Sequence, residues 1–185
     1  MRLDDSGRWV SVFCFFALTI STGAATSKNP TAQQCGVDQD RPAQRIFADP
    51  DGKRGWHEYR TVSDVPELDS GFGQFAKFWA GRDGDALISL EEPTEDFIAY
   101  TDYCFNKAGR IMRLRFELRT AWGWGYREEG PVVHGALVRQ TSEFFSTKDE
   151  VRVARPDQAN DVADALNPHL YQRESELPFS TLLSK

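Results

Sequence analysis

The sequence predicts an α+β domain: a single domain with a mainly antiparallel β-sheet, one short helix before a central hairpin and one near the C-terminus. Two observations carry this prediction. Apolar Met112, Leu114, Phe116 and Leu118 alternate with charged residues, which is the period of a half-buried strand. Short turn sequences, rather than long helices, separate most of the strand-like segments, and such turns favour antiparallel neighbours.

Residues 1–25 have the pattern of a signal peptide. An apolar run covers residues 9–20, small residues follow it, and Arg2 and Arg8 give the start a weak positive charge. The run is shorter than the roughly 20 residues that span a bilayer. We therefore expect a secreted or periplasmic protein with no membrane span in its mature form. An uncleaved anchor through residues 9–25 is the alternative, since Asp4 and Asp5 oppose a positive start.

The net charge of −6 and the absence of any Lys/Arg run argue against nucleic acid as a partner. The three histidines are scattered with no ligand spacing, so we expect no metal and no cofactor. An exported protein or a cell-envelope ligand is the expected partner.

Two cysteines remain after the predicted signal, Cys35 and Cys104. In an exported protein such a pair most simply forms one disulfide. Lipidation of Cys35 and a reactive thiol are the alternatives. The bond would attach a polar segment without periodicity, residues 26–48, which we expect to be extended or flexible, to the single α+β domain of residues 49–185.

Within that domain the elements follow in order. A turn at 49–52 precedes a short strand at 56–62. The spacing of Phe72, Phe75, Ala76 and Trp79 predicts a short helix over about 70–80. A strand at 86–90 then leads through an acidic, proline-containing loop to the hairpin.

The hairpin of residues 97–119 turns at 106–109, where Gly109 suits a positive φ. A four-residue turn places Asp102 opposite Arg113 and Asp96 opposite Arg119. A three-residue turn with a glycine bulge would slip the register by one and bury Asp102 among apolar residues, which is costly. We favour the first register, although Asn106 as the first residue of a type I turn favours the second.

The remaining chain predicts one long or two short strands over 132–145 and another at 151–153. Asp157 can cap a short helix that ends near Leu166. The tail carries Leu177, Phe179 and Leu182, which we expect to fold back onto the sheet.

The most unusual local sequence is the loop Trp122–Gly–Trp124–Gly–Tyr126. Aromatics separated by glycines can form a stacking platform, and neighbouring Arg119 and Arg127 offer donors to a ligand. We therefore expect a non-enzymatic ligand- or protein-binding module that uses a sheet face and this loop, with His134 as a further ligand-binding residue. A small secreted hydrolase is the alternative, with His134 or a loop carboxylate as base and Arg119 stabilising an anion. A bend whose tryptophans fill the core is the competing structural interpretation of the loop.

Overall fold

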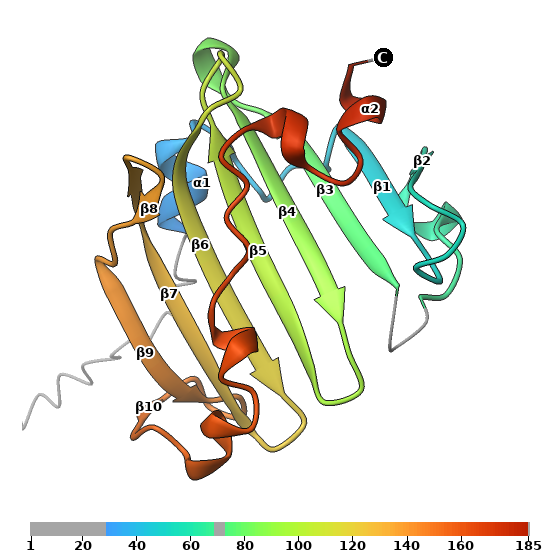
Figure 1. Cartoon of the computed structure of the whole chain (residues 1–185). Helices are drawn as coiled ribbons and strands as arrows, with labels where there is room; N and C mark the ends of the chain where they lie inside the picture. The colour runs from blue at the N-terminus through green and yellow to red at the C-terminus, as the bar shows by residue number, and fades with distance from the viewer. Residues whose placement is uncertain (1–28, 69–72, 185) are drawn as a thin grey trace, which may run out of the picture.

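One antiparallel sheet of ten strands dominates the computed structural model, which describes residues 29–68 and 73–184. The strand order is β10-β9-β7-β6-β5-β4-β3-β1-β2, and β8 pairs with β7 beyond that path (Figure 1). The strands are β1 (Arg45–Asp49), β2 (His57–Tyr59), β3 (Gln74–Ala80), β4 (Ala86–Pro93), β5 (Phe97–Phe105), β6 (Ile111–Thr120), β7 (Trp124–Val133), β8 (Ala136–Leu137), β9 (Thr141–Ser146) and β10 (Arg152–Val153). The single, mainly antiparallel sheet is confirmed, and the described chain is richer in strand than an α+β domain usually is.

The central hairpin β5–β6 forms as predicted, but its register differs from the one we favoured. Asn106 accepts the Gly109 amide in a tight turn, and Phe105 then faces Ile111, one residue away from the favoured pairing. A bulge between Cys104 and Phe105 adds a second residue of slip. The two one-residue shifts together move the pairing by two residues, so each side chain keeps the face that the favoured register gave it. Asp102 therefore lies on the same face as the arginines, opposite Arg115 instead of Arg113.

The helix predicted over 70–80 is wrong, since residues 74–80 form β3, and residues 69–72 lie outside the described part of the chain. β3 lies inside the sheet and is buried on both faces: Ala76 lies in the main core cluster, while Phe75 and Trp79 are buried from the opposite face. A strand with both faces buried loses the simple alternation. Its apolar residues therefore recur at a spacing like that of a helix, which explains the wrong prediction.

The segment 26–48 is more ordered than expected. Asn29 caps a short helix, α1 (Pro30–Gln34), by accepting the amides of Thr31 and Ala32. Residues from Arg45 onward then form β1, which pairs with β2 and β3. The predicted signal peptide at 1–25 lies outside the described residues.

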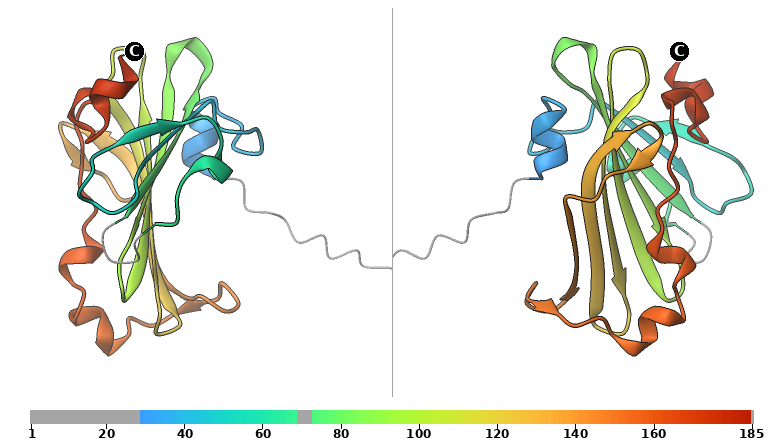
Figure 2. Two further views of the ribbon diagram at one scale, coloured as in Figure 1. Left: turned by 90° about the vertical axis from the view of Figure 1, so that its right-hand side faces the viewer. Right: turned by 60° about the vertical axis from the view of Figure 1, so that its left-hand side comes forward.

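The C-terminal segment, residues 157–184, crosses one face of the sheet, while α1 lies against the other (Figure 2). Leu177 and Phe179 are buried in the main core, and Phe179 stacks on Phe47 at 4.9 Å between ring centroids. The expected fold-back of the tail is therefore confirmed. The expected helix from Asp157 to Leu166 is wrong: two 3-10 turns replace it, η3 (Asp157–Asn160) and η4 (Asp164–Leu166). The tail also contains η5 (Glu174–Glu176) and α2 (Ser180–Leu183), and the earlier loops contain η1 (Val62–Asp64) and η2 (Arg82–Gly84).

The strand region at 132–145 contains parts of three strands, and the first begins earlier than expected. β7 already starts at Trp124, so only residues 121–123 remain as the turn after β6. β8 and β9 then follow as separate strands. The Trp-Gly-Trp-Gly sequence is therefore half turn and half strand.

Candidate binding surfaces

The two faces of the sheet have different chemistry. We call the side crossed by the C-terminal segment the covered face; its side chains include Leu114, Phe116 and Leu118. The opposite side is the charged face, which carries Asp102, Arg115, Glu117, Arg119, Arg127 and Glu143. Alternate residues of each strand supply the two faces. The charged residues that alternate with Leu114, Phe116 and Leu118 thus form a surface of their own.

Glu117 is the centre of the charged face. Its two carboxylate oxygens accept hydrogen bonds from Arg115 and Arg119, each at 2.6 Å. The Glu117 side chain is only 8% exposed, whereas both guanidinium groups reach solvent. Hydrogen bonds from two charged donors to a nearly buried carboxylate are strong and fix the geometry of all three groups. Glu117 therefore holds two arginines at set positions on an open surface.

Arg119 and Arg127 meet at the end of this face that lies near the β6–β7 and β9–β10 turns, which we call its outer end. Both lie over the ring of Phe145, at 5.4 and 4.7 Å from its centroid, and both reach Glu150 in the β9–β10 turn. Burial disfavours the charge on Arg119, but hydrogen bonds and charge from Glu117 and Glu150 outweigh it and raise its pKa. Arg119 thus remains cationic, and aromatic and acidic neighbours position both guanidinium groups.

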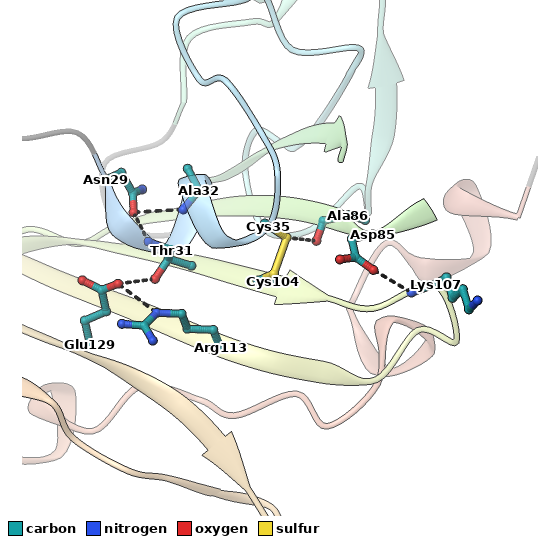
Figure 3. Close-up of a disulfide and its surroundings, with 10 residues drawn as sticks. All are labelled: Asn29, Thr31, Ala32, Cys35, Asp85, Ala86, Cys104, Lys107, Arg113 and Glu129. Atoms are coloured by element: carbon teal, nitrogen blue, oxygen red, sulfur yellow. Dashed lines mark hydrogen bonds and ion pairs between the residues drawn. A yellow bond between two sulfur atoms is a disulfide. The ribbon is translucent and has the colours of Figure 1, made fainter. Parts of the chain in front are cut away.

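The inner end of the charged face lies under α1 (Figure 3). Cys35, the C-cap of α1, forms the predicted disulfide with Cys104 on β5, with the Cα atoms 5.7 Å apart. Thr31 donates to Glu129 at 2.7 Å, and Glu129 also pairs with buried Arg113. A five-residue helix is too short to be stable alone. The disulfide and these polar contacts hold it in place.

Asp102 also lies beneath α1. Burial raises its pKa, against the nearby positive charge of Arg115. Asn29 Nδ2 donates to its carboxylate and to Gln39, so the helix cap and the charged face form one network.

The residues predicted to form one binding site are divided between the two faces. Trp124 and Tyr126 are buried on the covered face, whereas Arg119 and Arg127 lie on the charged face. Trp122 is 44% exposed in the turn and stacks on Trp124, with ring centroids 6.2 Å apart. β7 begins at Trp124, and from there on successive side chains point to opposite faces of the sheet, which causes this division. Trp122 is the aromatic side chain of this group that reaches the surface.

His134 lies apart from the other predicted residues. It is exposed in the turn between β7 and β8, with φ of 50°. Arg119 faces Gly125 on β7, and His134 comes nine residues after Gly125. At the rise of a strand, this puts His134 about 30 Å from the level of Arg119. His134 and Arg119 therefore do not converge.

A group of exposed apolar side chains that we did not anticipate lies at the same end of the sheet as Trp122. Val151 is 57% exposed and Val153 is 37% exposed, both at β10. Trp124, Ser146 and Val151 are consecutive across β7, β9 and β10, because Trp124 faces Ser146 and the Ser146 amide donates to the Val151 carbonyl. We call Trp122, Val151 and Val153 the edge patch. The alternation Val-Arg-Val was visible in the sequence, but its exposure was not.

A second unanticipated group lies beneath the C-terminal segment. Burial raises the pKa of Glu92 on β4, against the charge of His169, and Gln74 donates to this carboxylate at 3.0 Å. Tyr103 donates to the His169 carbonyl at 2.8 Å, and the rings of His169 and Tyr171 are 4.3 Å apart. Glu92 belongs to the segment that we expected to be an acidic loop, and instead it lies in β4 and interacts electrostatically with His169 of the C-terminal segment.

Two depressions lie near opposite parts of the sheet. One of about 990 Å³ lies beside α1, between the 36–42 loop and the end of β3, and is lined by side chains that include Gln39, Arg41 and Trp79. One of about 610 Å³ lies between the β5–β6 turn and the tail. Residues 29–68 and 73–184 contain no cluster of histidine, cysteine and acidic side chains that could hold a metal. No helix in these same ranges is long and apolar enough to cross a membrane.

Comparison of the chain with protein families, curated proteins and solved structures finds no match.

Proposed function

We propose that this protein is an exported, non-enzymatic binding module that recognises a protein or cell-envelope ligand at the outer end of its sheet. The binding surface consists of the edge patch on one side of the sheet and Arg119 and Arg127 on the other. Secretion or periplasmic location is part of the proposal. It is supported by the signal-like sequence of residues 1–25 and by the disulfide.

The observation that carries the proposal is the exposure of Trp122, Val151 and Val153 at the same end of the sheet. Tryptophan is enriched at protein interfaces, and exposed apolar side chains that adjoin one another mark interaction sites more often than scattered ones do. Trp122 stacks on buried Trp124, so its ring is presented on a firm support. Less conformational freedom is then lost when a ligand binds.

The hydrolase alternative receives no such support. It needs a base and an anion-stabilising group that converge, and His134 and Arg119 are separated by most of β7. Of the acidic residues near the β4–β5 turn, Glu91 and Glu92 are adjacent in a strand and so point to opposite faces.

The test is a binding screen of the mature protein against exported proteins and cell-wall glycans. A ligand of the proposed surface should lose at least tenfold in affinity with Trp122→Ala. Val62→Ser is the matched control, because Val62 is also exposed and apolar, at 55%, but lies near the opposite edge of the sheet. Ligands that bind Trp122→Ala as tightly as the wild type would contradict the proposal.

A further inference from the structure

We propose that the β10 edge binds an extended, acidic peptide segment of a partner as an additional β-strand. This inference rests on the proposed function and names the class of ligand. Strand addition to an exposed sheet edge is a common mode of peptide recognition, in which backbone hydrogen bonds supply affinity and alternate side chains supply specificity.

The backbone of β10 is available for such pairing. β10 is the last strand on its side of the sheet, and all five residues from 151 to 155 are exposed. The Ser146 amide donates to the Val151 carbonyl at 2.9 Å, so that carbonyl points toward β9. Because these groups alternate along a strand, the N–H and C=O of Arg152 point away from the sheet.

The side chains of β10 specify what an added strand would carry. Val153 faces Phe144 on the covered face, and Val151, two residues earlier, lies on the same side, so apolar residues of the added strand would contact them. Arg152 lies on the other side, opposite Phe145. An added strand that alternates apolar and charged residues would match both sides of the edge.

The charge balance around Arg152 favours an acidic ligand. Arg119 and Arg127, which lie over Phe145, are paired with Glu117, Glu143 and Glu150. Arg152, by contrast, forms no ion pair with any residue in the described ranges. A carboxylate opposite it would gain a cross-strand pair. A basic residue there would be repelled.

The experiment measures fluorescence anisotropy at low salt with two labelled, acetylated hexapeptides, one alternating valine and aspartate and the other alternating valine and lysine. We expect the wild type to bind the acidic peptide at least tenfold more tightly than the basic one. Arg152→Glu should reverse that preference. Arg60→Glu is the matched control, since Arg60 is exposed next to β2 at the other edge, and it should behave as the wild type.

Arg152→Pro tests the backbone part of the proposal. Proline removes the outward N–H of residue 152 without removing a hydrogen bond to β9, so the melting temperature should stay close to that of the wild type while peptide binding is lost. Should this variant unfold, the charge reversal with Arg152→Glu still decides.

Charged residues on edge strands also serve to prevent pairing. If Arg152 has only that role, neither peptide binds the wild type, and the inference is overturned. Equal binding of the acidic peptide to wild type and Arg152→Glu overturns it as well. The proposed function fails separately, through the comparison of Trp122→Ala with Val62→Ser on screened ligands.

Discussion

The two faces of the sheet are made by the same strands, yet they differ in what stabilises them. On the covered face, Leu114, Phe116 and Leu118 pack with the C-terminal segment, and burial of apolar area stabilises the contact. On the charged face, Arg115 and Arg119 converge on Glu117. Ion pairs near solvent contribute much less than an apolar core.

This difference separates stability from recognition. The covered face carries the fold, so changes there should unfold the protein. Most of the charged face and the β10 edge contribute little to the stability of the fold, so changes there should alter binding more than stability. α1 is the exception, because the disulfide ties it to the charged face.

The largest expected effect comes from uncovering the apolar face. Truncation after Arg173 removes Leu177 and Phe179 from the core, and the product should not fold. Phe179→Ala is the milder form of this change. Replacement of a fully buried phenylalanine costs about 3–5 kcal/mol, measurable by urea denaturation.

Leu183→Ser is a control for the truncation, because Leu183 lies in the same segment but is only partly buried. A truncated protein that stays folded and monomeric would mean that the tail is not part of the core.

Removal of the disulfide should have the next largest effect. Cys35 and Cys104 are 69 residues apart, and Cys35→Ser with Cys104→Ser should cost about 2–5 kcal/mol. Since α1 is short, the reduced protein should lose hydrogen-exchange protection in residues 30–37 before the sheet does. Equal protection of α1 in the oxidised and reduced protein would contradict this assignment.

Breaking the charged face should cost less. Glu117→Ala leaves Arg115 and Arg119 without their shared acceptor, which should destabilise the fold by about 1–3 kcal/mol. Glu95→Ala, at an exposed carboxylate, should be neutral in the same denaturation experiment. A loss as large as that of Phe179→Ala would erase the distinction between the faces.

The smallest expected effect concerns Glu92 and depends on pH. Because burial raises the pKa of Glu92, its contribution to stability is fully present below the pKa of the unfolded state and is lost as pH rises through the folded pKa. Glu92→Gln keeps an acceptor for Gln74 without the charge. The variant should melt higher than the wild type at pH 7, and the gain should shrink toward pH 4. A gain of the same size at both pH values would contradict the assignment.

Local alternation in the sequence predicts the central part of this fold well. It identifies β5 and β6, which face of them is apolar and which is charged, and β4 on one side. On the other side, β7 begins at Trp124, whereas the predicted strand began at residue 132. Alternation does not give the exact register, because the register depends on both the one-residue shift at the Asn106 turn and the further shift at the bulge between Cys104 and Phe105. It also misassigns β3, because a strand buried on both faces has no period of two.

The candidate site could be predicted only in part. Trp122 and Arg119 were found from their unusual neighbourhood, but their separation onto different surfaces depends on where the turn ends and β7 begins. The exposure of Val151 and Val153 depends on the sheet ending at β10, which is a property of the whole topology. The burial of Glu92 likewise requires the C-terminal segment to cross the sheet, a contact between distant parts of the chain.

The most direct test of the separation between stability and recognition is thermal denaturation of Trp122→Ala beside Trp124→Ala. The two tryptophans stack on each other, but one is 44% exposed and the other 5%. Trp124→Ala should lose about 3–5 kcal/mol, or roughly 6–20 °C, whereas Trp122→Ala should melt within about 2 °C of the wild type. A Trp122→Ala protein that melts as low as Trp124→Ala would make Trp122 a core residue and would contradict its place in a binding surface.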